Sequence, residues 1–368
     1  MTPRELVYFT GHLLGLDEHP GFRQEAIDRI CSGGVDWDYF VQFCSDELII
    51  PAVCLKMRKH RLLNLLPEEL VTALKEIYEL NAHRNQQILR QIDDITALLN
   101  RENIFPVFLK GSGNLLSGLY HDIGERMMGD IDLLVEEDDY LKAGKLLESA
   151  GYSRSDKVYV DILKTTHYPR LFRKGTPADV EIHRIPVSEK YAGALSARTV
   201  LRQKVSVGEK QGCYVESDEH KVIHTFLHSQ MKDFGHRDKK TSFRGLYDLY
   251  LLSERVDITA LTKSVPYPEK MGYWIILTKR ILGLTESFYP AETPKAQRYY
   301  KRYDRSLRFY RSHRLYTFFM KLYDLLAVRY GGRIIRAIFV KGQWKEIYIR
   351  VKDPQWYGLH FANYKEHF

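Results

Sequence analysis

The chain has 368 residues, of which 44% are hydrophobic and 28% are charged, and its net charge is +8 at pH 7. A composition of this kind builds a buried core in two to three domains, and it excludes a disordered or fibrous protein. The charge is unevenly distributed, because residues 291–368 hold 17 Lys and Arg against 6 Asp and Glu, a net of +11. The first 290 residues therefore carry a net charge of −3, and the partner of the tail is expected to be anionic or simply water.

The cysteine pattern and the apolar stretches indicate the compartment. The four cysteines are Cys31, Cys44, Cys54 and Cys213. They have no CxxC spacing, which argues against a disulfide scaffold and a zinc module and is typical of a reducing cytoplasm. The first residues lack the apolar region of a secretion signal, and the most apolar stretch, 318–328, is too short and too charged to cross a bilayer. We therefore expect a cytoplasmic protein with no transmembrane segment.

Residues 1–100 have the patterning of helices. Apolar residues recur at helical spacing over 37–44, and a longer amphipathic pattern begins at Pro67 and runs to Leu99. Proline followed by two acids is a favourable helix start, because proline needs no hydrogen-bond acceptor there and the acids interact well with the helix dipole. An N-terminal helical region over 1–100 is predicted.

Residues 101–188 alternate strand-like and helical segments. Strands are predicted at 104–110, 130–135, 158–163, 167–172 and 179–185, with short helices at 115–120 and 140–150. The second helix is followed by Gly151, a favourable residue at a helix end. This order predicts an α+β fold built on a small mixed sheet.

From residue 189 the pattern returns to helices. Helix faces are predicted at 222–231 and 246–251, a further helix after Pro266 and Pro268 that runs through Trp274 and Leu282, and a hairpin around 208–212. These segments define a C-terminal helical region over 189–290. The last region, 291–368, interleaves basic and aromatic residues and becomes partly strand-like near its end.

Acidic residues two apart occur on two of the predicted strands. Alternation along a strand places Asp130 and Asp132 on one face, and it likewise places Asp179, Glu181 and His183 on one face. Carboxylates held side by side repel one another unless a cation neutralises them. A third carboxylate from a neighbouring strand completes an oxygen-rich site suited to Mg²⁺.

A glycine turn before these strands has the features of a phosphate site. Gly111 and Ser112 follow a predicted strand and precede a predicted helix, where exposed amides and a hydroxyl can hold phosphate oxygens. Glycine also allows the main chain to approach a ligand closely. Lys110 and Arg126 add positive charge. Together with the acids, these are the parts of a phosphoryl- or nucleotidyl-transfer site.

The motifs together resemble a known family. They are Leu109-Lys110-Gly111, Tyr120, Arg126, Asp130–Val135, Gly151-Tyr152 and Glu181-Ile182-His183. The order LKG…Y…R…DIDLLV…GY…EIH is similar to that of an uncharacterised bacterial nucleotidyltransferase family, in the superfamily of DNA polymerase beta and the aminoglycoside nucleotidyltransferases. The resemblance covers roughly 35–285. It implies a palm-like nucleotidyltransferase core flanked by the two helical regions.

The resemblance also implies residue roles. Gly111 and Ser112 would form the nucleotide loop, Asp130 and Asp132 would hold two Mg²⁺ ions, and Glu181 would be the third carboxylate. The 17 residues between Ser112 and Asp130 exceed the separation in polymerase-like members. The expected reaction moves an NMP from an NTP, with ATP the expected nucleotide, to an acceptor hydroxyl and releases pyrophosphate. The acceptor, a small molecule or a protein, is not identified by the sequence.

Two other functions remain open. One is a nucleotide-binding or antitoxin-like regulatory module without turnover. The intact acids argue against it, since we expect nothing but a metal to hold three like charges together. The other is a polyanion-binding protein that uses the basic tail to bind nucleic acid or anionic lipid. A solvated helix whose tyrosines pack on the main body is the favoured interpretation of the tail.

Several residues also have simpler interpretations. Lys110 can cap a strand, and Arg126 can pair at the surface with Glu125 or Asp122. Asp179 competes with Glu181 as the third carboxylate, and only the family pattern favours Glu181.

The histidines admit more than one role. His183 and His228 are candidates for the substrate cleft, although His183 suits a structural role equally well. His220, His224 and His228 span about 12 Å of helix, so they cannot all bind one zinc ion. A helix salt pair is expected between Arg244 and Asp248.

Overall fold

The computed structural model describes residues 1–154, 165–289 and 292–325. The chain divides into two compact units, Met1–Tyr303 and Asp304–Phe368. The strand predicted at 158–163 and the tail beyond residue 325 lie outside the described residues. Among the described residues, no helix has the length and apolar character needed to span a membrane.

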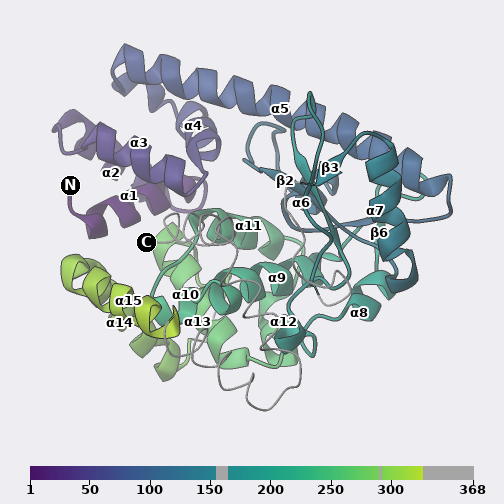
Figure 1. The fold of residues 1–368 in the computed structure, drawn as a ribbon. Coiled ribbons are helices and arrows are strands. Elements are labelled where there is room, and N and C mark those ends of the chain that lie inside the picture. The colour runs from purple at the N-terminus through teal and green to yellow at the C-terminus, as the bar shows by residue number, and fades with distance from the viewer. Residues whose placement is uncertain (155–164, 290–291, 326–368) are drawn as a thin grey trace. The chain divides into compact units, whose positions relative to one another are not determined.

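The N-terminal part is helical, as predicted. Its helices are α1 (Pro3–Leu14), α2 (Pro20–Cys31), α3 (Trp37–Asp46), α4 (Ile50–Lys59) and α5 (Glu68–Asn100). Helix α5 has 33 residues, and it extends from the other N-terminal helices to α7 beside the sheet (Figure 1). It therefore connects the helical region to the core.

A seven-stranded mixed sheet forms the core of the first unit. The strands are β1 (Val107–Phe108), β2 (Asp130–Leu134), β3 (Ser153–Arg154), β4 (Leu171–Phe172), β5 (Asp179–His183), β6 (Val205–Ser206) and β7 (Tyr214–Val215). Their order is β3-β4-β5-β2-β1-β7-β6. Strands β2 and β5 are parallel neighbours, and their apolar residues Ile131, Leu133, Val180 and Ile182 are fully buried. The α+β prediction is confirmed.

Three predicted elements in the core have wrong boundaries. The first strand is shorter than 104–110, and α6 spans Lys110–Leu116 instead of beginning at 115. Lys110 adopts a left-handed backbone with φ of 50°, which ends the strand and starts the helix at once. The strand predicted at 167–172 is reduced to β4, with an isolated bridge between His167 and His183. Helix α7 (Tyr140–Ser149) and a left-handed Gly151 agree with the prediction.

Helix α8 (Ala197–Arg202) precedes β6 and β7, which form the predicted hairpin. The helices that follow are α9 (Asp218–Phe226), α10 (Gly235–Asp238), α11 (Phe243–Ser253), α12 (Ile258–Ser264), α13 (Pro268–Leu282) and α14 (Pro294–Arg308). A π-helix, Leu227–Lys232, continues α9. Helix α15 (Tyr310–Tyr323) lies in the second unit.

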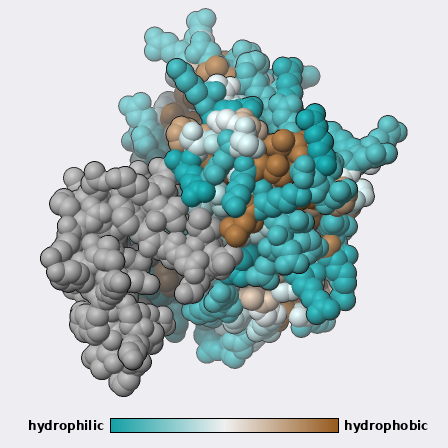
Figure 2. Space-filling view, turned by 45° about the vertical axis from the view of Figure 1, so that its right-hand side comes forward, coloured by the Kyte–Doolittle hydropathy of each residue, from teal (hydrophilic) through white to brown (hydrophobic). Residues whose placement is uncertain are grey.

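The N- and C-terminal helices of the first unit pack closely. A Cβ added at Gly11 of α1 would lie 2.1 Å from the carbonyl oxygen of Ile281 in α13, so only glycine allows this approach. Trp274, also in α13, is almost fully buried. The face shown in Figure 2 is mainly hydrophilic, interrupted by a few groups of hydrophobic side chains.

Candidate active site

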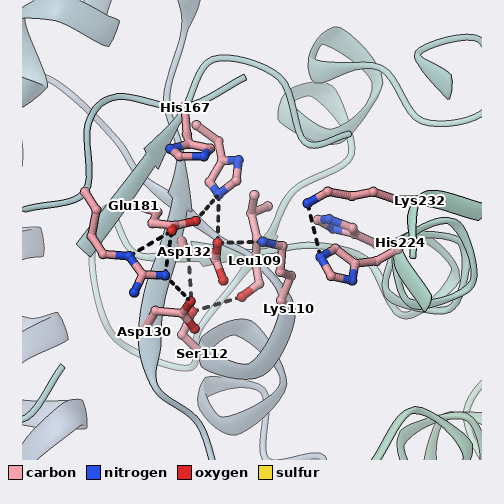
Figure 3. Close-up of polar contacts among 12 residues, drawn as sticks. Leu109, Lys110, Ser112, Asp130, Asp132, His167, Glu181, His224 and Lys232 are labelled. Carbon is pink, nitrogen blue, oxygen red and sulfur yellow. Dashed lines mark hydrogen bonds and ion pairs between the residues drawn. The ribbon is translucent and has the colours of Figure 1, made fainter. Parts of the chain in front are cut away.

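Acidic side chains meet on the two central parallel strands. Asp130 of β2 is paired with Asp179 of β5, and Asp132 is paired with Glu181. One ligand atom each of Asp132, Glu181 and His183 lies within 4.8 Å of the others, and this trio is a candidate metal-holding group among the described residues. In Figure 3, Asp130, Asp132 and Glu181 lie together at the centre of the view. The predicted alternation of polar and apolar faces is confirmed.

Basic groups of the chain itself neutralise these acids. Lys110 Nζ and His183 Nε2 each lie 2.7 Å from Asp132 Oδ1. Arg170 Nη2 donates to Glu181 Oε1 at 2.9 Å. The expectation that only a metal could hold the acids together is therefore wrong, because the Lys110 and Arg170 cations offset their charge and His183 hydrogen-bonds Asp132.

The two aspartates of β2 differ in protonation. Burial alone would raise the pKa of Asp132, but the Lys110 ammonium and the His183 imidazole hold it well below its usual range. Burial and the neighbouring Asp132 charge raise the pKa of Asp130. Burial lowers the pKa of His183, so its imidazole is neutral at neutral pH. The site thus combines Asp132, which stays charged, Asp130, which protonates more readily, and the neutral imidazole of His183.

The predicted nucleotide loop begins α6, directly beside the acids. The Lys110 amide donates to Glu216 Oε2 at 3.4 Å, and its ammonium points toward Asp132 (Figure 3). The Ser112 hydroxyl is buried, 2.9 Å from the Leu109 carbonyl oxygen and 3.2 Å from that of Asp132. The loop and the acids therefore come together, and the serine hydroxyl faces backbone in the structure.

Arg126 belongs to a buried network. Its Nη2 donates to Asp248 Oδ2 at 3.0 Å, and its Nε lies 3.2 Å from Asp248 Oδ1 and 3.0 Å from the Tyr120 hydroxyl. Neither surface acid considered from the sequence is its partner. The predicted pair of Arg244 with Asp248 is also wrong, because Asp248 binds Arg126 and Arg244 Nη1 donates to the Met127 carbonyl.

Polar side chains of α5 hold the loops that lead into both central strands. They are Asn81, Arg84, Asn85 and Gln91. Arg84 donates to the carbonyls of Met128 and Pro177, which precede β2 and β5 respectively. Asn85 donates to the Arg126 carbonyl at 2.8 Å. Sequence reasoning missed this role, although the polar residues within the apolar pattern of α5 were a signal.

The three histidines four residues apart do not share a ligand. His224 Nδ1 lies 2.9 Å from the buried Glu216 Oε1, whereas His228 Nδ1 lies 3.0 Å from Asp233 Oδ2. Lys232, at the end of the π-helix, lies 3.4 Å from His228 Nε2. Figure 3 shows Lys232 and His224 beyond Lys110, across from the acids. This helical segment therefore faces the site, and π-helices are frequent at functional sites.

The mixed sheet, the paired acids and the adjacent helix start are consistent with the α+β core of a nucleotidyltransferase. A protein family described as "Uncharacterised nucleotidyltransferase" matches residues 33–264. Because the match covers more than half of the chain, the chain belongs to this family. The arrangement is also consistent with the polymerase beta-like superfamily. No curated protein matches the chain.

Proposed function

We propose that this protein is a metal-dependent nucleotidyltransferase that moves an NMP from an NTP to an acceptor hydroxyl and releases pyrophosphate. The observation that carries the proposal is the convergence of Asp132, Glu181 and His183 beside Lys110 at the start of α6. Asp130 lies on the same face, two residues before Asp132 on β2. Family membership supports the class of reaction.

The donor set fits a divalent cation. Asp132 and Glu181 supply carboxylate oxygens, which Mg²⁺ and Mn²⁺ prefer, and the neutral His183 imidazole needs no deprotonation to join them. His183 Nδ1 is buried without a hydrogen-bond partner, so the ring is held mainly through Nε2. We propose two Mg²⁺ ions held by Asp130, Asp132 and Glu181. A bound metal would neutralise phosphate charge.

The chain's own residues would orient the reactants. We propose that Lys110 and the amides of Gly111 and Ser112 contact the triphosphate. The proton of the acceptor hydroxyl would pass to water, because Asp130, Asp132 and Glu181 are assigned to the metal ions. The hydroxyl oxygen would bond to the α-phosphorus as the bond to the pyrophosphate oxygen breaks. His228 is proposed to line the acceptor side of the site.

We further propose ATP as the nucleotide and the cytoplasm as the compartment of the protein. The four cysteines are free thiols, which supports a reducing compartment. The basic side chains Lys110 and Arg170 at the site favour an anionic ligand such as a nucleotide.

The test is incubation with each α-labelled NTP, Mg²⁺ and a cell extract. The wild type is expected to transfer label, and Asp130→Ala/Asp132→Ala is expected not to. The matched control is Glu136→Ala/Asp138→Ala, which removes two exposed carboxylates at the same spacing just after β2. Transfer by the control and not by the site variant supports the proposal. Tight nucleotide binding with no transfer by the wild type would instead favour a regulatory module.

A further inference from the structure

Arg170, directly before β4, extends the row of charged side chains on β2 and β5. Leu171 of β4 pairs with Val180 of β5 in antiparallel register, which puts Arg170 next to Glu181. Glu181 in turn is paired with Asp132 of β2. Glu181 therefore has the Asp132 carboxylate on one side and the Arg170 guanidinium on the other.

The guanidinium contacts three carboxylates unequally. Its Nη2 and Nε lie 2.9 and 3.1 Å from Glu181 Oε1. The separations from Asp130 Oδ2 and Asp179 Oδ2 are longer, 3.5 and 3.7 Å. Two short hydrogen bonds to one carboxylate and two long contacts leave this side chain less firmly held than Arg126.

Arg170 is more exposed to solvent than a residue of a buried structural ion pair. Its side chain is 43% exposed, whereas that of Glu181 is 12% exposed. The side chain of Arg126, in its buried network, is only 10% exposed. Arg170 therefore reaches solvent on one side while it neutralises the acids on the other, and it can leave them without crossing the core.

A divalent cation and Arg170 would share one carboxylate, that of Glu181. Glu181 belongs both to the candidate metal-holding trio and to the shortest contact of Arg170. Like charges this close repel, so a cation bound by Asp132 and Glu181 would weaken the hold on the guanidinium. The planar guanidinium fork binds phosphate oxygens well through two parallel hydrogen bonds.

We propose that Arg170 is a phosphate-binding residue that exchanges between two partners. The Arg170 guanidinium pairs with the carboxylates until a nucleotide binds, and it then forms its hydrogen bonds with the phosphate oxygens instead. Metal and triphosphate binding would therefore reinforce each other. This inference rests on the proposed function, because it assigns Arg170 to the triphosphate of the same site.

The experiment measures two affinities of the full-length chain. Mn²⁺ binding is followed by loss of the free-ion electron paramagnetic resonance signal, and binding of inorganic triphosphate at fixed Mn²⁺ is followed by calorimetry. The variants are Arg170→Gln, Arg170→Lys and the control Lys174→Gln, which removes a charge from an exposed position four residues on. Thermal unfolding of each variant checks that it is folded.

Arg170→Gln is expected to bind Mn²⁺ alone roughly tenfold more tightly and triphosphate roughly tenfold more weakly. Arg170→Lys should keep wild-type Mn²⁺ affinity, since the charge remains, and lose part of the triphosphate affinity. Lys174→Gln should change neither. If Arg170→Gln weakens Mn²⁺ binding, or leaves triphosphate binding unchanged, Arg170 is a structural brace and the proposal is wrong.

The same measurements separate this inference from the proposed function. A wild type that binds both probes, with no effect of Arg170→Gln, overturns the assignment of Arg170 alone. A wild type that binds neither probe overturns the proposed function, and the role of Arg170 with it. Asp132→Asn should abolish Mn²⁺ binding whether or not Arg170 contacts phosphate.

Discussion

The buried pair of Arg126 and Asp248 is expected to be a major determinant of stability next to the site. Asp248 accepts hydrogen bonds from Arg126 Nη2 at 3.0 Å and from Tyr120 at 2.8 Å. Both charged side chains are nearly inaccessible to solvent. Asp248→Ala would therefore leave a guanidinium buried without a counter-ion, which costs about 3–5 kcal/mol. At about 2 °C per kcal/mol, the unfolding midpoint should fall by roughly 6–10 °C.

A double-mutant cycle measures the interaction itself. The single variants are Arg126→Met and Asp248→Leu, and the double variant replaces the pair with apolar side chains of similar volume. We expect the double variant to unfold within about 2 kcal/mol of the wild type, because no unpaired charge remains in it. The assay is thermal and urea unfolding of the full chain. Additive losses in the double variant, or a loss below about 1 kcal/mol for Asp248→Ala, would refute the reasoning.

Three further predictions concern the acids, the loop and pH. Glu181→Gln should weaken Mn²⁺ binding at least about tenfold, whereas Asp179→Asn, outside the metal-holding trio, should change it less than about twofold. Equal effects of the two variants in Mn²⁺ titrations followed by electron paramagnetic resonance would contradict this. Gly113→Ala should lower the free energy of unfolding by about 1–3 kcal/mol, because the added Cβ would lie 2.5 Å from the Phe108 carbonyl oxygen in β1. Gly111→Ala, whose Cβ would lie 3.5 Å from Met128 Cβ, should keep its stability but bind triphosphate more weakly. Equal losses of stability for the two variants in urea unfolding would contradict this. Burial lowers the pKa of His236 to about 4, so the unfolded chain takes up a proton before the folded chain does as the pH falls, and the stability present above pH 6.5 is lost toward pH 4. In His236→Gln, the unfolding midpoint should therefore fall less steeply between pH 6.5 and pH 4. If the midpoints of wild type and variant fall in parallel with pH, His236 is not the cause of the loss.

The acids of the site can be predicted from sequence because they depend on local geometry. Alternation along a strand is a property of each strand alone, so it places Asp130 with Asp132, and Glu181 with His183, on common faces whatever the pairing of the strands. The helix start at Lys110 could not be placed as well. It depends on a left-handed residue that packing against the sheet maintains, and local propensity disfavours that conformation for lysine.

The basic partners could not be predicted, because they are fixed by contacts distant in the chain. Asp248 lies 122 residues from Arg126, and the local spacing rule chose Arg244 instead. A helix pair contributes only about 0.3–0.5 kcal/mol, whereas two hydrogen bonds to a buried guanidinium outweigh it. Arg170 likewise meets Glu181 only because β4 joins the edge of β5.

The site therefore combines acids held rigidly by the sheet with basic side chains that can move. Asp132 and Glu181 project from central strands whose alternate residues are fully buried, so their separation is set by the sheet. Lys110 and Arg170 reach them with long side chains that are 26% and 43% exposed. Because the acids cannot separate and the basic groups can withdraw, the charge of the site can change without movement of the backbone. A site of this kind can fold with its own cations and then exchange them for those that accompany a substrate.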